Sequence, residues 1–332
     1  MHNRSRAASA GWRLCLAAVF ARGAQLAPRP AAAGTSAEIR LTPLLPSGQP
    51  AGTTVAWTAG AGGLRGEAAR YRFSVALDSG GWRVARDFSP DNFFLWTPLV
   101  EGSYQVQVTV QDIETGETRA ATAPYLIRSR LSGLRPEAAA TSHPLVLLFS
   151  APPCPAGRVR VRFLALPAGA WQATPWQPCR PDMSLNVYVA GLRAVTLYEL
   201  QAEVETNAGL ERGPLVWRRT GAIDAELPDV TVLDRAGPRA SRQDAVLLQS
   251  VNGGVYEKVL PVATDLSGQV IWYYRFREIE NPRFPWHIGQ YLLRPAPGGT
   301  FLLFLNYRGG FDQVLREIDL AGNPVRETNV EQ

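Results

Sequence analysis

The sequence predicts an all-β protein made of several modules. Apolar and polar residues alternate with a period of two over many short stretches, and 30 glycines and 26 prolines supply frequent turns. The apolar content of 46% is that of a globular chain and excludes an intrinsically disordered one. We therefore expect antiparallel strands, each half-buried on one face.

Residues 1–33 have the pattern of an export leader. They contain five arginines and no acidic residue, and a basic start is followed by the apolar stretch Leu14–Ala21 and the small residues Ala31–Ala33. This order is typical of a secretory signal peptide, and a disordered basic tail or a misplaced start codon is the alternative. The leader predicts a periplasmic or secreted protein.

The charge and the apolar runs of the remaining chain argue against a nucleic-acid partner and against a membrane span. The net charge is +5, and removal of the five leader arginines brings it to 5 − 5 = 0. A neutral body has no concentrated basic face, so we expect no nucleic-acid partner. No apolar run reaches the roughly 18 residues of a membrane span, so we expect no integral membrane segment.

Two cysteines remain once the leader, which holds Cys15, is set aside. Cys154 and Cys179 both lie in proline-rich, turn-like sequence. An even number of cysteines in an exported chain predicts a disulfide, with two reduced and unrelated thiols as the alternative. Two thiols alone do not complete a tetrahedral metal site, so we expect no metal.

Residues 36–130 form the first predicted module. In the segment Gly102–Asp112, Tyr104 and three valines at every second position share one face. Further strands are expected at Thr53–Thr58, Tyr71–Leu77, Trp82–Asp87, Phe93–Trp96 and Ala120–Ile127, which makes a β-sandwich of about seven strands. The Glu-Gly-Ser-Tyr turn resembles that of immunoglobulin-like and PKD-like modules. We expect the tryptophans of this module to be core residues, with a sugar-binding platform as the alternative; they are Trp57, Trp82 and Trp96.

A short linker at Arg128–Gly133 leads to a second β module at residues 131–222. Within Leu185–Val204, an apolar strand ends in Gly191-Leu192, and Tyr198 opens the next strand. This pattern resembles a fibronectin type III domain, although Ala194 stands where proline is usual. The resemblance implies an immunoglobulin-like β-sandwich and no function, because such modules serve in many unrelated proteins. Protein or glycan contacts through the two sandwiches are an open expectation.

Residues 223–332 contain an internal repeat. The element Asp-Leu-x-Gly begins at Asp265 and again at Asp319, 319 − 265 = 54 residues apart. A repeat of that length, made of strands and tight turns, predicts propeller blades. We expect Gly268 and Gly322 to take a positive φ and each aspartate to cap its own turn, a structural role.

The repeat region is too short for a closed ring. One more strand pair is expected within Ile288–Phe304, which gives about two blades where about four are the usual minimum. We therefore expect the start of an incomplete β-propeller, and the chain to be the N-terminal part of a longer protein.

The stretches Ala263–Trp272 and Arg316–Thr328, behind a leader and β modules, resemble the bacterial arylsulfotransferase (aryl-sulfate sulfotransferase) family. That family consists of periplasmic β-propellers. The resemblance implies transfer of a sulfuryl group from an aryl sulfate donor to a phenolic acceptor through a sulfo-histidine, with no cofactor. The family's catalytic histidines belong to later blades, so we expect this chain alone to be inactive.

Few residues here are candidates for that chemistry. His287 precedes a predicted inner strand and is the candidate for a channel-facing catalytic residue, against the alternative of a loop histidine with no role. Arg294 and Arg308 are further candidates for the channel mouth. His2 in the leader and His143 at a module boundary are expected to be incidental.

Two other interpretations stay open. A quinoprotein-type propeller carries Ala-x-Asp-x-x-x-Gly-x-x-x-Trp in its blades, and Ala263, Asp265, Gly268 and Trp272 follow this pattern with one residue missing. The other interpretation is a non-catalytic periplasmic or surface scaffold, in which the sandwiches present a propeller that binds but does not react.

Overall fold

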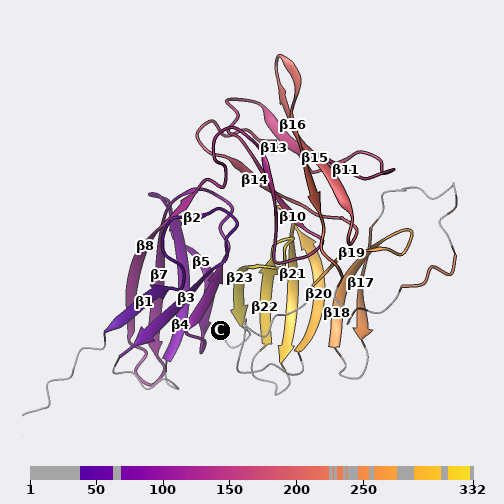
Figure 1. Cartoon of the computed structure of the whole chain (residues 1–332). Coiled ribbons are helices and arrows are strands. Elements are labelled where there is room, and N and C mark those ends of the chain that lie inside the picture. The colour runs from indigo at the N-terminus through magenta and orange to yellow at the C-terminus, as the bar shows by residue number, and fades with distance from the viewer. Residues whose placement is uncertain are drawn as a thin grey trace, which may run out of the picture. The chain divides into compact units, whose positions relative to one another are not determined.

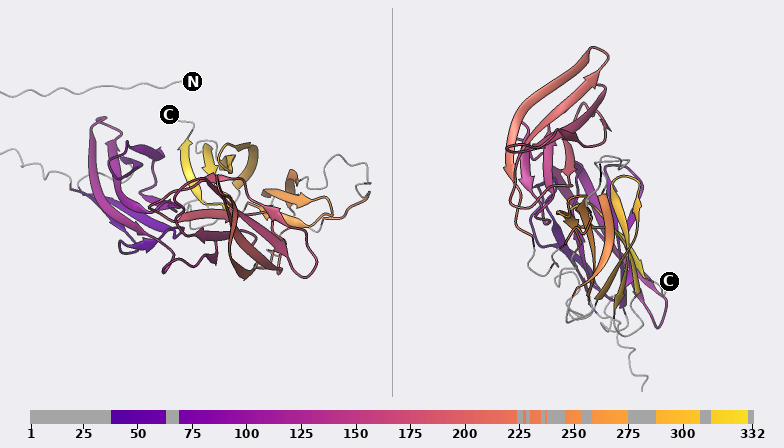
Figure 2. Two further views of the ribbon diagram at one scale, coloured as in Figure 1. Left: turned by 90° about the horizontal axis from the view of Figure 1, so that it is seen from above. Right: turned by 90° about the vertical axis from the view of Figure 1, so that its right-hand side faces the viewer.

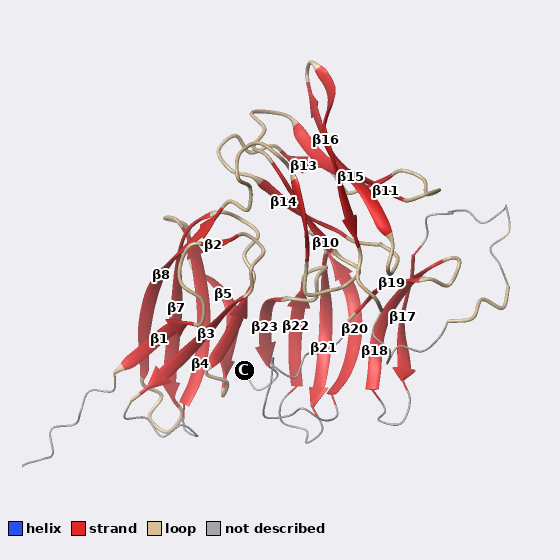
Figure 3. Ribbon diagram, viewed as in Figure 1, coloured by secondary structure: helices blue, strands red, loops and turns tan. Residues whose placement is uncertain are grey.

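The computed structural model describes residues 38–62, 69–223, 227, 230–234, 237, 246–253, 258–274, 288–307 and 313–329. In these residues every regular element is a β-strand (Figure 3), which confirms the predicted all-β class. The described residues include no helix that could cross a membrane. The leader lies outside them, as do His2 and Cys15.

Eight strands form what we call the first sandwich, residues 38–128. They are β1 (Ile39–Pro43), β2 (Gln49–Pro50), β3 (Val55–Ala61), β4 (Ala69–Leu77), β5 (Arg83–Ser89), β6 (Phe93–Trp96), β7 (Gly102–Asp112) and β8 (Thr118–Arg128). One sheet has the order β1-β3-β6, and the other contains β2-β8-β7-β4-β5 (Figure 1). A single buried cluster joins residues of both sheets, with Trp57 from β3 and Phe73 from β4 fully buried. The predicted strand at Gly102–Asp112 is confirmed, and Tyr104 is buried as its alternation requires.

The tryptophan prediction holds for two residues and is wrong for the third. Trp57 and Trp96 lie in the core, where both rings contact Tyr125 edge-on. Trp82 is 48% exposed, because it precedes the start of β5 and is not held by the alternation of that strand. Tyr104 donates from its hydroxyl to the Val100 carbonyl, and burial raises its pKa to about 12.

Eight more strands form the second sandwich, residues 137–219. They are β9 (Glu137–Ala140), β10 (Leu147–Ala151), β11 (Arg158–Ala165), β12 (Gln172–Ala173), β13 (Gln177–Pro178), β14 (Leu185–Val189), β15 (Leu197–Thr206) and β16 (Gly209–Arg219). The sheet β14-β10-β9 faces the sheet β12-β11-β15-β16, with β13 also paired to β11. β15 and β16 form a long hairpin, which the right-hand view of Figure 2 shows in salmon.

The fibronectin-type turn of the second sandwich adopts the expected geometry. Gly191 has a φ of 80°, and Leu192 is fully buried beside it. Tyr198 is buried at the start of β15, and its hydroxyl accepts a hydrogen bond from the Arg193 amide.

The repeat region forms two antiparallel sheets. The first repeat sheet contains β17 (Val246–Gly253), β18 (Lys258–Asp265) and β19 (Val270–Tyr273), and the second contains β20 (Ile288–Ala296), β21 (Thr300–Tyr307), β22 (Gln313–Ile318) and β23 (Pro324–Asn329). In each sheet, strands consecutive in sequence are neighbours. The predicted strands of the repeat are therefore confirmed. Among the described residues no sheet closes on itself, so the propeller stays a prediction.

The second repeat sheet also meets the first sandwich. β23 pairs in parallel with β5 at Glu327 and Arg86, which places the two sheets in one nine-stranded order. By their contacts the described residues from 38 onward belong to one compact unit. The module boundaries expected near residues 130 and 222 stay predictions.

Candidate functional site

The predicted catalytic candidates lie mostly outside the part of the chain that the structure describes, so the predicted site stays a prediction. His287 and Arg308 lie outside the described residues, and the side chain of Arg294 on β20 is exposed. Within the described part of the chain, no group of three or more histidine, cysteine or acidic side chains could hold a metal ion. A small pocket of about 20 Å³ beside Arg86, Phe93 and Glu327 has room for about one water molecule.

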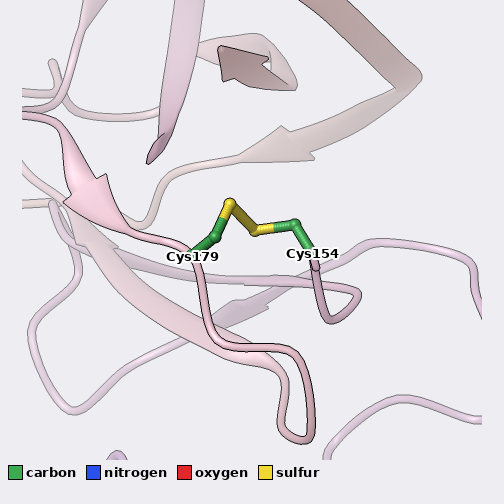
Figure 4. The surroundings of a disulfide bond; sticks show 2 residues. All are labelled: Cys154 and Cys179. Atoms are coloured by element: carbon green, nitrogen blue, oxygen red, sulfur yellow. A yellow bond between two sulfur atoms is a disulfide. The ribbon is translucent and has the colours of Figure 1, made fainter. Parts of the chain in front are cut away.

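The predicted disulfide is confirmed. Cys154 follows β10, Cys179 follows β13, and Figure 4 shows the bond that joins these two loops. The Cα atoms are 5.2 Å apart, and the Cys179 amide donates to the Gly157 carbonyl. The bond therefore ties the loop between β10 and β11 to the loop between β13 and β14.

The two Asp-Leu-x-Gly elements fold into matching turns. Asp265 Oδ1 accepts from the amides of Ser267 at 2.9 Å and Gln269 at 3.0 Å. Asp319 Oδ1 accepts in the same way from the amides at positions 321 and 323, both at 2.9 Å. Gly268 and Gly322 have φ values of 81° and 80°, a region that side chains other than glycine's disfavour. The predicted capping role of both aspartates is confirmed.

The second carboxylate oxygen of each turn reaches the second sandwich. Arg193 donates to Asp265 Oδ2 from Nη2 at 2.7 Å and from Nε at 3.2 Å. Tyr188 donates from its hydroxyl to Asp319 Oδ2 at 2.9 Å. Each aspartate thus holds its own turn through Oδ1 and the second sandwich through Oδ2, and Asp319 Oδ2 also accepts from the side-chain amide of Asn323 in its own turn. We call this set of contacts, together with those of His143 described next, the junction.

His143 links the turn before β10 to the end of β19. The Leu145 amide donates to His143 Nδ1 at 3.0 Å, so Nδ1 carries no proton. Nε2 therefore bears the proton and donates to the Tyr273 carbonyl at 2.8 Å. Burial lowers the pKa of His143 to about 4, so the ring is neutral at neutral pH. His143 therefore has a structural role that the sequence did not indicate, since Nδ1 holds its own turn and Nε2 reaches the repeat sheets; the expectation that it takes no part in catalysis stays a prediction.

Apolar side chains fill the junction on either side of His143. Leu145 and Val146 are fully buried and enter two different clusters of the repeat sheets. Leu145 packs with Leu260 and Val262 of β18, whereas Val146 packs with the cluster between the two repeat sheets. Full burial of one such side chain contributes about 1.5–3 kcal/mol, so this dipeptide stabilises the junction more than any single hydrogen bond.

Trp272 connects the two repeat sheets at the same place. Its indole nitrogen donates to the Leu320 carbonyl at 2.8 Å, and its ring lies 4.6 Å from that of Phe301. Trp272 therefore has a structural role, because it joins the buried cluster that the two repeat sheets share.

The electrostatics of the two turns differ because their partners differ. Burial would raise the pKa of Asp265, but hydrogen bonds from Ser267 and Arg193 outweigh it and hold the pKa below its ordinary value. Burial raises the pKa of Asp319, whose partner Tyr188 carries no charge. Burial and the neighbouring Asp319 carboxylate raise the pKa of Tyr188 well above its ordinary value, which keeps its hydroxyl a donor.

A buried ionic cluster lies where β23 meets β5. Arg86 contacts Asp91 and Glu327, and Arg316 donates to Glu327 Oε2 at 2.6 Å and to the Tyr274 hydroxyl at 3.1 Å. Burial would raise the pKa of Glu327, but Arg316 and Arg86 outweigh it and lower the pKa. Like the junction, this cluster commits its charged groups to holding strands together.

Comparison with known proteins identifies no family. No protein-family model matches the sequence, and no curated protein sequence matches it. Among solved structures, a segment of two fibronectin type III domains from chicken tenascin is similar over 56% of this chain and 98% of that chain, with 13% identity and a TM-score of 0.20. A likeness at that TM-score gives no basis for assigning a function.

Proposed function

We propose that this chain is a non-catalytic support, in which the second sandwich holds the two repeat sheets of a β-propeller in place. The observation that carries this proposal is the junction. There the carboxylates of Asp265 and Asp319 each accept hydrogen bonds both from their own repeat turn and from the second sandwich. His143 also contacts both parts, because Nδ1 accepts from the Leu145 amide in its own turn and Nε2 donates to the Tyr273 carbonyl of the repeat. Groups engaged so fully are poorly placed to act as nucleophiles or bases.

The propeller itself belongs to this proposal. Two antiparallel sheets with the same turn, which share one buried cluster that includes Trp272, support an assignment as successive blades. A ring needs at least about four blades, so we assign the remaining ones to a longer protein of which this chain is a part. Export of that protein is supported by the bond between Cys154 and Cys179, since structural disulfides persist in oxidising compartments.

Aryl-sulfate sulfotransferase activity of the longer protein is the second candidate. It is favoured by the resemblance at residues 263–272 and 316–328, which includes both aspartate turns. In this proposal a histidine of a later blade takes the sulfuryl group from an aryl sulfate and passes it to a phenol. His287 stays a candidate for the channel.

The two candidates are separated by one assay on two proteins. The 332-residue chain and the product of the longest reading frame that contains it are incubated with a chromogenic aryl sulfate and phenol. We expect no turnover by the 332-residue chain, and sulfuryl transfer by the longer protein supports the enzyme. Turnover by the 332-residue chain that His287→Ala abolishes would contradict the support role. A longer protein without sulfuryl-transfer activity would contradict the sulfotransferase proposal and would be consistent with the support role.

A further inference from the structure

The larger sheet of the second sandwich carries a row of cations on its outer face. On β11 the side chains of Val159, Val161 and Phe163 are buried in the core. Because strand residues alternate between the two faces of a sheet, the positions next to them lie on the outer face. These positions are three arginines: Arg158, Arg160 and Arg162. A row of guanidinium groups therefore follows β11 on the outside of the sandwich.

Two tryptophans cover this row. The guanidinium carbon of Arg162 lies 4.0 Å from the ring centre of Trp171. Trp176 contacts the other two arginines, at 4.8 Å from Arg158 and 4.4 Å from Arg160. Each indole thus has one face against a cation, which is a favourable contact. Trp171 is nevertheless 42% exposed and Trp176 is half-buried, so the ring faces turned away from the arginines meet solvent.

The chain holds both rings in fixed positions. β12 directly follows Trp171, β13 directly follows Trp176, and both short strands pair with β11. Between them, the Thr174 amide donates to the Val161 carbonyl at 2.9 Å, and the Thr174 hydroxyl accepts from the Val161 amide at 3.0 Å. The disulfide at Cys179 closes this segment. An aromatic surface that is ordered before binding loses little conformational entropy when a ligand arrives.

The charges beneath the rings are balanced by the chain itself. Glu205 of β15 contacts Arg158. Glu203, also on β15, contacts Arg160 at 2.7 Å and Arg162 at 3.8 Å. An anionic ligand would have to displace these carboxylates, so the charge of this face disfavours acidic glycans, phosphates and nucleic acids. The exposed ring faces are therefore suited to a neutral ligand.

The two rings are spaced along one line. Trp176 contacts the first two arginines of the row and Trp171 contacts the third, so the rings are separated by the length of three residues of β11. At about 3.4 Å per residue this length is about 10 Å, which is about two sugar units of an extended glycan chain. In a β-1,4-linked chain, units two apart have the same orientation. Both can therefore turn a C–H face to the same side, one to each indole.

We propose that Trp171 and Trp176 form a binding platform for a neutral, β-linked polysaccharide, whose sugar rings stack on the outer faces of the two indoles. An indole offers a flat apolar surface to the C–H face of a pyranose ring, while the hydroxyls of the sugar reach water and polar neighbours. The guanidinium and carboxylate groups beside the rings offer hydrogen bonds to such hydroxyls, whereas a lipid surface would require a continuous apolar patch. The inference goes beyond the proposed support function and concerns a different surface from the junction.

The test is binding of the full chain, with its disulfide intact, to hexasaccharides of β-1,4-linked glucose and of β-1,4-linked N-acetylglucosamine, measured by isothermal titration calorimetry. We expect saturable binding to at least one of them that high salt leaves unchanged, because the ligand carries no charge. Trp171→Ala should weaken binding by about tenfold or more, and Trp171→Phe, which keeps a flat ring, should recover part of the affinity. The matched control is Trp82→Ala in the first sandwich, where the replaced ring is 48% exposed, and it should bind as the wild type does.

Three results would overturn the proposal. They are a wild-type chain that binds neither hexasaccharide, binding that Trp171→Ala leaves unchanged or that Trp82→Ala weakens equally, and binding only to an acidic polysaccharide such as alginate that high salt abolishes. Circular dichroism of each variant, with the wild-type β signal and melting temperature, excludes loss of fold as the cause. Enzymatic turnover plays no part in these outcomes, so failure here is distinct from failure of the proposed function.

Discussion

Protonation of His143 should loosen the junction between the second sandwich and the repeat sheets. In the folded chain Nδ1 accepts from the Leu145 amide, and the ring packs against Tyr273 with a centroid separation of 4.7 Å. A proton on Nδ1 would oppose that amide and place a charge in a buried position. Acidification should therefore destabilise the protein through this residue.

The magnitude follows from the pKa of His143. Burial lowers it from 6.5 to about 4, a difference of 2.5 units, and each unit corresponds to about 1.4 kcal/mol. The unfolded chain binds the proton first as pH falls, so the stabilising contribution is complete above pH 6.5 and is lost as the pH falls towards 4. The loss should be about 2 kcal/mol at pH 5 and about 3 kcal/mol at pH 4.

The assay is urea unfolding of the wild type and of His143→Gln between pH 8 and pH 5. Carboxylates with lowered pKa values, such as Glu327 and Asp265, add their own acid dependence to both proteins. The difference in unfolding free energy between wild type and variant removes that shared dependence. It should fall by about 2 kcal/mol over this range. A difference that does not change with pH would refute the reasoning, because it would mean that the folded chain accepts the proton as readily as the unfolded one.

Two further predictions concern the repeat turns and the disulfide. Gly268→Ala and Gly322→Ala should each cost about 1–2 kcal/mol for a positive φ, and Gly268→Ala should cost more because its Cβ would lie 2.7 Å from Val232 Cγ2; equal melting temperatures for the two variants would contradict this. Replacement of Cys154 and Cys179 by serine should lower the unfolding free energy by about 3 kcal/mol, because the bond restricts the unfolded chain; thiol labelling of the denatured, unreduced wild type should find neither cysteine free, and two labelled thiols would refute the bond.

Local features of this fold could be predicted from the sequence. The alternation in Gly102–Asp112 places Tyr104 in the core, and Asp-Leu-x-Gly specifies a turn within five residues. The pairing of the two cysteines followed from their number and their turn-like surroundings. In each case the information lies within a short segment, because the period of a strand and the φ of a turn are local properties.

The junction could not be predicted in the same way. His143 meets Tyr273 across 130 positions, and Tyr188 meets Asp319 across 131. No local pattern marks either residue, since a Ser-His-Pro turn and an alternating strand are equally consistent with exposed side chains. Trp82 shows the opposite error. A large apolar residue in the expected strand suggested a core position, but β5 begins one residue later and Trp82 is exposed.

If the second sandwich holds the repeat sheets in place through the junction, the two parts should open as one unit. Hydrogen exchange followed at increasing urea concentration, with peptides from β10, β18 and β22, measures the opening free energy of each element directly. We predict one common value for the three strands, and an equal decrease in all three on His143→Gln. Opening of β18 and β22 at a lower free energy than β10, with His143→Gln leaving β10 unchanged, would contradict the claim.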